Sequence, residues 1–266
     1  MNLPHLHVIE AIEGPLAFLL RRGASWEVCP FGWDREAQAD QSDQWLKGCI
    51  HAHRNDLSPD GRHMISFATD GHRSWSVISR ALWFSALAFL PQQTTWQGGG
   101  TFTPEGSLLW LNGGNASRKS LPDGLRAAPT DACPHSTDGF TDGDLHATAQ
   151  SHRGWGRLSG GGCDITLGKE LGPVLRLQMQ ISMGKKDRAL FSNRYALRPE
   201  DFVQSKPDWD WAEARQEFLH ISARAMLFAA EICRYGPSPA RPLHDFSGMY
   251  FQQRTMPNVG AEGNVS

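Results

Sequence analysis

The chain has 266 residues, a formal net charge of −2 at pH 7 and a sequence pI near 6.6. Its length allows one large all-β domain or two ordinary domains. A near-neutral balance lacks the basic surface that nucleic acids and anionic membranes attract, so neither is expected as a partner. Hydrophobic residues at 40% and charged residues at 20% indicate a globular and not a disordered chain.

The tryptophan and cysteine content restricts the expected fold class and the expected kinds of site further. Ten Trp against three Tyr favours β architecture, because Trp is large and packs well between sheets. The five cysteines are odd in number and form no Cys-x-x-Cys pair, so we expect buried apolar side chains instead of a disulfide framework or a zinc knuckle. The sequence shows no signal-peptide pattern and no apolar run of about 18 residues, which predicts a reducing cytoplasm.

In chain order, the first third predicts short strands joined by turns. Residues 1–30 read as strand, turn and strand, and 31–47 is polar and predicts a loop or short helix. Residues 49–54 (Cys-Ile-His-Ala-His-Arg) alternate with period two, which is typical of a half-buried strand. Further strands are predicted at 64–68, 74–79 and 83–90.

A repeated turn organises this part of the sequence. Ser58-Pro59-Asp60-Gly61 is followed by an apolar run, and so is Thr103-Pro104-Glu105-Gly106. The two copies are 45 residues apart, from Pro59 to Pro104 and from Gly61 to Gly106 (104 − 59 and 106 − 61). Proline fixes φ at the first corner, the acid bonds the following backbone, and glycine adopts the left-handed conformation. Weaker copies are predicted at 121–124 and 198–201.

The remaining chain alternates between loops and strands. Residues 113–143 are rich in Gly, Asn, Ser, Pro and Asp, which predicts a long surface loop inserted into the domain. Short strands are predicted at 145–158 and 163–167. The clean alternation of 174–183 predicts a strand that pairs with 189–197.

Residues 210–235 fit two structures. Apolar side chains recur at steps of three and four, and Asp210 with Glu213 resembles a capping box, so the favoured prediction is an amphipathic C-terminal helix. The alternative is the last β-hairpin, with strands at 217–222 and 226–233. We expect a single domain over 1–257 and a flexible tail at 258–266.

The two turns resemble those of β-propeller repeat proteins of the WD40-like and TolB-like kind, whose blades often carry a Ser-Pro-Asp-Gly turn before an apolar strand. The resemblance covers about 49–112. It implies a mainly antiparallel all-β fold of four or five irregular blades that acts as a binding platform. It implies no catalytic residue, since a fold alone does not define a function.

The candidate chemistry lies beside the first turn. On a strand, His51 and His53 would share one face, about 7 Å apart at ~3.4 Å per residue. Together with Asp56 they are candidate ligands for one divalent metal, because imidazole and carboxylate suit Zn, Fe or Ni. Ordinary half-exposed histidines are the favoured interpretation, and no cofactor is then expected. The Gly-rich segments lack the Lys-Ser/Thr of a phosphate loop, and the Asp-Gly pairs lack the complete calcium-loop pattern.

Three functions follow from these observations. The leading hypothesis is a non-enzymatic module that binds another protein through its loops, one form of which is an inhibitor or immunity-type partner. The second is a metal-dependent hydrolase or lyase that uses His51 and His53. The third is a small-ligand sensor with an aromatic-lined channel. The sequence leaves the oligomeric state open.

Overall fold

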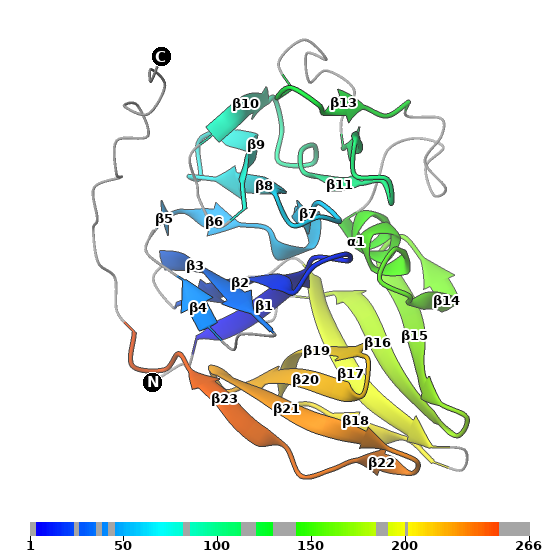
Figure 1. Cartoon of the computed structure of the whole chain (residues 1–266). Coiled ribbons are helices and arrows are strands. Elements are labelled where there is room, and N and C mark those ends of the chain that lie inside the picture. The colour runs from blue at the N-terminus through cyan, green and yellow to red at the C-terminus, as the bar shows by residue number, and fades with distance from the viewer. Residues whose placement is uncertain are drawn as a thin grey trace, which may run out of the picture.

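The computed structural model describes residues 4–23, 27–35, 39–41, 46–81, 86–112, 121–129, 142–184, 191–199 and 202–249. The described strands form five sheets, which we call blades 1 to 5 in chain order, and each comes from one continuous stretch of sequence (Figure 1). Pairing is antiparallel throughout the described strands, apart from one short parallel contact between β12 (Leu108–Leu111) and β13 (Arg126–Ala127). The fold is a five-bladed β-propeller, which confirms the expected propeller and decides between the four or five blades that were predicted.

The blades differ in size. Blade 1 contains β1 (His5–Glu10), β2 (Leu16–Arg22), β3 (Glu27–Asp34), β4 (Ala39–Gln41) and β5 (Leu46–Lys47). Blade 2 contains β6 (Cys49–Ile50), β7 (Asp56–Leu57), β8 (His63–Thr69), β9 (Ser74–Arg80) and β10 (Ala86–Gln92), and a 3-10 turn, η1 (Ala52–Arg54), lies between β6 and β7. Blade 3 contains β11 (Gly100–Phe102), β12 (Leu108–Leu111) and β13 (Arg126–Ala127).

The last two blades are longer. Blade 4 contains β14 (Gly156–Gly161), β15 (Asp164–Gly172), β16 (Leu175–Met183), β17 (Phe191–Pro199) and β18 (Gln204–Lys206). Blade 5 contains β19 (Trp209–Arg215), β20 (Phe218–Ala223), β21 (Met226–Cys233), β22 (Gly236–Pro237) and β23 (Arg241–Asp245). The predicted pairing of 174–183 with 189–197 is confirmed by the continuous β16–β17 register.

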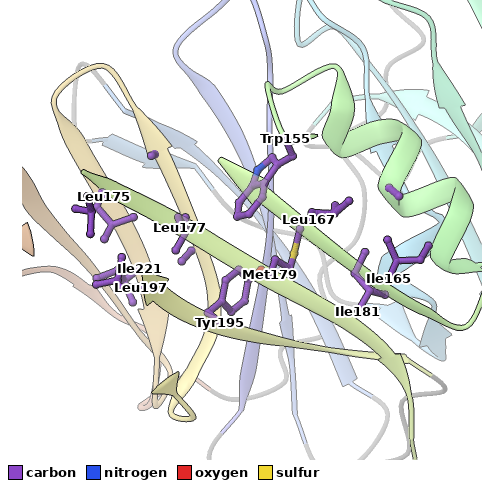
Figure 2. Close-up of a cluster of buried hydrophobic side chains, with 14 of the residues drawn as sticks. Trp155, Ile165, Leu167, Leu175, Leu177, Met179, Ile181, Tyr195, Leu197 and Ile221 are labelled. Atoms are coloured by element: carbon purple, nitrogen blue, oxygen red, sulfur yellow. The ribbon is translucent and has the colours of Figure 1, made fainter. Parts of the chain in front are cut away.

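Apolar side chains close the ring of blades. Separate clusters fill the contacts between blades 1 and 2, blades 2 and 3, blades 4 and 5, and blades 5 and 1. Figure 2 shows part of the contact between blades 4 and 5, where Leu167, Met179 and Tyr195 of blade 4 and Ile221 of blade 5 belong to one buried cluster. Each blade therefore buries its alternating apolar positions against its neighbours, as the period-two pattern requires.

The two repeated turns occupy equivalent places. In blade 2 the turn joins β7 to β8, its antiparallel partner, and in blade 3 the turn joins β11 to β12, which are also antiparallel partners. Gly61 and Gly106 have the same left-handed φ of 74°, and each donates its backbone N–H to the first residue of its turn. The structure confirms the repeat because the two turns match in position, dihedral and hydrogen bond. The weaker copy at 121–124 is a turn, whereas Arg198 and Pro199 end strand β17 and the rest of that motif lies outside the described residues.

Several expected elements are wrong. Residues 210–235 form the strands β19, β20 and β21 instead of an amphipathic helix, because their apolar residues also alternate between two packed faces. Residues 145–151 are not a strand, since Asp142–Ser151 form the helix α1, and within the predicted range 145–158 only 156–158 belong to a strand, the start of β14. Residues 31–34 extend β3, so the loop or short helix predicted there is also wrong.

Helix α1 joins blade 3 to blade 4. It contacts η1, β11, β14 and β15 (Figure 1). All its residues except Ser151 are buried. Most of 113–143, the predicted loop insertion, lies outside the described residues, but its described part includes β13 and the start of α1. Helix α1 thus fills the contact between blades 3 and 4, where the described residues form no apolar cluster directly between the two sheets.

Arg153, in the turn that follows α1, connects two blades through its buried side chain. The guanidinium of Arg153 donates from Nη2 to Oδ1 of Asp56 at 2.7 Å and from Nε to the carbonyl of Glu10 at 2.9 Å. Asp56 belongs to blade 2 and Glu10 to blade 1. The Arg153 and Asp56 side chains are 7% and 3% exposed, so the pair is shielded from water.

The network extends from this pair to the other three blades. In blade 3, the hydroxyl of Thr101 donates to Oδ2 of Asp56 at 2.6 Å. The carbonyl of Arg153 accepts from Nζ of Lys169 in blade 4 at 2.8 Å, and that ammonium pairs with Glu213 in blade 5 at 2.5 Å. All five blades therefore meet in one polar network at the centre of the molecule.

No helix among the described residues is long and apolar enough to cross a membrane.

Candidate functional site

A cavity of about 140 Å³ lies at the centre of the propeller, where the blades converge. Blades 1, 2, 4 and 5 and helix α1 all contribute to its wall. Its apolar part comes from side chains such as Leu20, Val28, Ile50 and Phe191. Its polar and aromatic part comes from His5, Arg22, His51, His53, Asp142, Asn193, Trp209 and Asp210, with His7 on β1.

Three imidazoles from different elements meet beside this cavity. His7 lies on β1, His53 in η1 and His146 in α1. The ring centroids of His53 and His146 are 4.6 Å apart, and the ring of His7 lies 5.9 Å from each. Residues from three elements that are far apart in the sequence thus form a compact polar cluster.

The amide of Asn193 on β17 connects two of these rings. Nε2 of His53 lies 2.9 Å from Oδ1 of Asn193, and Nε2 of His146 lies 3.4 Å from its Nδ2. Because an amide oxygen only accepts and an amide nitrogen only donates, His53 carries its proton on Nε2 and His146 accepts there. The same amide nitrogen donates to the hydroxyl of Tyr195 at 3.4 Å. The network therefore fixes ring orientation and tautomer.

Burial keeps these imidazoles neutral. It is the main cause that lowers the pKa of His7 to about 3 and of His51 to about 4, and it also lowers the pKa of His53 and His146 below the usual value of 6.5. A charged imidazole would lose its hydration without a full replacement in this setting. At neutral pH the cavity therefore presents uncharged hydrogen-bonding rings.

Both carboxylates of the cavity wall contact a basic side chain. Asp142 accepts from Nε of Arg54 at 2.5 Å, with both side chains buried. Asp210 accepts from Nδ1 of His5 at 2.8 Å, so this pair joins blade 5 to blade 1. The guanidinium of Arg54 is held further by the carbonyls of Thr95 and Gln97.

The candidate metal residues take different positions from those expected on a strand. Strand β6 ends at Ile50, so His51 follows the strand and His53 belongs to the 3-10 turn. The prediction of one strand carrying both is wrong, although both side chains reach the cavity. Asp56 turns to the polar network instead: its two oxygens accept from Leu57, Thr101, Phe102 and Arg153.

The structure gives no support for a metal at these residues. Among the described residues, no group of three or more His, Cys, Asp or Glu is arranged to hold a metal ion. The Asp-Gly-Asp segment at 142–144 also differs from a calcium loop, because it forms the first turn of α1. The metal hypothesis stays a prediction that elemental analysis of the purified protein would test.

His51 carries an unusual polar atom. Its ring packs against Phe67 with centroids 5.0 Å apart, and its Nε2 is buried with no hydrogen-bond partner in the described part of the chain. Leaving a buried donor or acceptor unpaired costs about 1–3 kcal/mol. Only a polar group that reached this nitrogen would relieve that cost.

Sequence reasoning found His51 and His53 but missed His7, His146 and Asn193. His7 was visible as a polar residue on an apolar strand, which is a weak signal because such residues often face solvent. His146 was assigned to a strand that is a helix, and Asn193 had no motif at all. Only the ring of blades brings these residues together.

Comparisons with known proteins add little beyond the fold. No family model and no curated protein matches the sequence. The chain is similar to Kuenenia stuttgartiensis hydrazine synthase at 10% identity and a TM-score of 0.33, covering 87% of this chain and 78% of that one. It is also similar to acylaminoacyl peptidase in complex with Z-Gly-Gly-Phe-chloromethyl ketone, at 9% identity and a TM-score of 0.33. The match covers 92% of this chain, which spans about half (53%) of the length of that one.

A further similar structure is the β-propeller domain of the Trilobed protease from Pyrococcus furiosus, described with an open velcro topology. Identity is 8% and the TM-score 0.30, with 91% of this chain and 84% of that one covered. Likenesses at this level supply no argument about activity or ligand. The function has to be inferred from the cavity and the surface.

Proposed function

We propose that this protein is a binding β-propeller that captures a small molecule in its central cavity. The observation that carries the proposal is a cavity shared by four blades whose lining includes His51, a residue with no hydrogen-bond partner at Nε2 among the described residues. Ligand sites are typically concave and largely apolar, with a few fixed polar groups. This cavity has that composition.

The size and rigidity of the cavity support the proposal. A cavity of about 150 Å³ holds a benzene-sized molecule, and this one is about 140 Å³. The Asn193 amide holds the rings of His53 and His146, so donors and acceptors are oriented before a ligand arrives. Preorganisation of this kind lowers the entropic cost of binding.

Thermal unfolding in the presence of small molecules tests this function. The panel contains acids, amides and amines of six to ten non-hydrogen atoms, each at millimolar concentration. A ligand that binds only the folded state raises Tm, with a stabilisation of about 2.7 kcal/mol at 100 times its Kd. We expect at least one class to raise Tm in a saturable manner.

Two variants test whether a shift in Tm arises from binding in the cavity. His51→Phe keeps the aromatic contact with Phe67 but removes the ring nitrogen, so it should weaken binding at least fivefold. The matched control, His72→Phe, changes an exposed histidine in the β8–β9 turn and should leave binding unchanged. A panel that never shifts Tm, or equal effects of the two variants, would contradict the proposal.

A second candidate is the protein-binding module that the resemblance suggested, in which an inhibitor or immunity-type partner is one special case. It is favoured by an aromatic patch on the outer strands of blade 2. Phe89 is 54% exposed and stacks on Trp75 with centroids 6.1 Å apart, and Leu87 beside it is 43% exposed. Exposed aromatic clusters are enriched in the energetic centres of protein interfaces.

Affinity capture from native lysate tests this candidate. A stoichiometric partner should be recovered by the natural chain and lost with Phe89→Ser. Tyr235→Ser is the control, because Tyr235 is also exposed but lies in blade 5 between β21 and β22. A partner that both variants retain, or a chain that stays monomeric and unpartnered by light scattering, would count against it.

A further inference from the structure

We infer that strand β10, at the outer edge of blade 2, binds a second copy of this chain, with the two β10 strands antiparallel across a two-fold axis. This inference rests on the second candidate function, protein binding, and names the partner of the patch around Phe89. Three features of β10 lead to it: an edge without a strand partner in the described region, a sequence without charge, and two exposed apolar side chains.

Strand β10 is the last strand of its sheet. The strand order of blade 2 is β10, β9, β8 and β6, so β10 pairs only with β9 among the described strands. In Figure 1 it lies at the rim of the propeller, beyond β9. The backbone groups on the far side of an edge strand can pair with a strand of another chain. The outer edge of blade 2 therefore offers a place for contact between strands of two chains.

The composition of β10 favours its own copy as the partner. Its seven residues, Ala86–Gln92, include no charged side chain. Edge strands elsewhere in the described part of the chain do carry charges, for example Arg126 in β13, Lys206 in β18 and Arg241 in β23. Charged residues at an edge hinder pairing between chains. In a two-fold dimer each residue meets the same patch of the other copy, so a charged strand would bring like charges together, whereas β10 would not.

The side chains of β10 are apolar on both faces of the sheet. Ala88 and Leu90 are buried in the contact between blades 2 and 3. Leu87 and Phe89 are exposed, and the ring of Phe89 is held by its stacking on Trp75 of β9. If two β10 strands pair with Ala88 opposite Ala88, Leu87 of each copy lies opposite Phe89 of the other. The exposed apolar side chains of each copy are then covered by those of the other.

Other features of β10 keep the contact short. Pro91 has no backbone N–H to donate. The carbonyl of Leu90 accepts from Nε2 of Gln92 at 3.2 Å, and the register with β9 shifts between Ala86 and Ala88. Backbone pairing is therefore confined to the middle of the strand, and the exposed side chains supply much of the binding energy. We expect a reversible dimer whose population rises with protein concentration.

Analytical ultracentrifugation over a micromolar dilution series tests the dimer. The natural chain should change from monomer to dimer mass as its concentration rises. Phe89→Asp and Leu87→Lys should each weaken the dimer at least tenfold, because each replaces an apolar contact with a charge that loses hydration on binding. Tyr235→Lys changes an exposed side chain between β21 and β22 of blade 5 and should leave the dimer unchanged.

Mixing the two charged variants tests the antiparallel arrangement. In a mixed dimer the new lysine of one copy faces the new aspartate of the other, and the second pair, Phe89 with Leu87, stays intact. The mixture should therefore dimerise at least fivefold more tightly than either variant alone. A variant that had merely lost its fold would not be rescued in this way, so the mixture separates a lost contact from lost folding.

The outcomes separate this inference from the function on which it rests. A natural chain that stays monomeric at every concentration, or a mixture that dimerises no better than its components, would overturn the pairing of two β10 strands. If a monomeric chain still captures a different protein, and Phe89→Ser abolishes that capture, only the second copy is overturned and the protein-binding function stands. If the chain is monomeric and captures no partner, both are overturned.

Discussion

Replacing Arg153 with methionine should destabilise the whole propeller, because this side chain is the centre of the polar network. Methionine keeps the length of the stem and removes the guanidinium. The change leaves the buried carboxylate of Asp56 without its cation and removes donors from the carbonyls of Glu10 and Ala149. No ligand is needed for this effect.

The magnitude follows from the burial of the pair. Breaking a buried ion pair by removing one partner costs about 3–5 kcal/mol, since an uncompensated charge remains in a site that water does not reach. Total stability of a protein is typically about 5–15 kcal/mol. For a chain of this size each kcal/mol corresponds to about 2–4 °C, so Tm should fall by about 6–20 °C.

Urea unfolding followed by Trp fluorescence measures the change, and two further variants test its cause. Arg73→Met removes an arginine that is 83% exposed and paired with Asp70, so it should cost at most about 1 kcal/mol. Adding Asp56→Asn to Arg153→Met should recover part of the loss, because the unpaired charge is then gone. A loss for Arg153→Met no larger than that for Arg73→Met would refute the assignment of Arg153 as the centre of the network.

Three more predictions follow from the fold. Gly61→Ala should cost about 1–3 kcal/mol in urea unfolding, and more than Gly71→Ala, because both have positive φ but the new Cβ meets other atoms at 3.2 Å only in the first case. Phe246→Ala should cost about 3–5 kcal/mol and raise hydrogen exchange in β23, because this buried ring fills the contact between blades 5 and 1. Burial lowers the pKa of His7 from 6.5 to about 3, so its contribution to stability is complete above pH 6.5 and is lost as pH falls toward 3. His7→Gln should therefore reduce the pH dependence of unfolding free energy in that window, and an unchanged slope would contradict the burial of a neutral ring.

Local sequence features predicted the parts of the fold that local physics determines. A Pro-acid-Gly turn needs only four residues to define its dihedral angles, so the two copies at Gly61 and Gly106 were visible without knowledge of the sheets. The strand at 175–183 was also clear, because its alternation reflects one packed face. Such signals do not depend on distant neighbours.

The errors occurred where distant packing decides the structure. Residues 210–235 have apolar spacing that fits both a helix and paired strands, and the neighbouring blades select the strands. Helix α1 lacks an apolar stripe because it is buried on nearly all sides, so the periodicity that identifies a surface helix is absent. The residues of 210–235, or of α1, do not by themselves determine which structure forms.

The same dependence on distant packing explains why the sequence did not predict the central cavity. His53 lies 46 residues after His7 (53 − 7), and Asn193 lies 140 residues after His53, and no motif spacing relates the three. Their proximity depends on ring closure, which here relies on side chains because blade 1 and blade 5 share no strand among the described pairs. The bond from His5 to Asp210 crosses that seam at the edge of the cavity. The proposed ligand site and the closure of the ring share this contact. We therefore expect a ligand that holds Trp209 and Asp210 against blade 1 to slow hydrogen exchange in the strands on both sides of the seam.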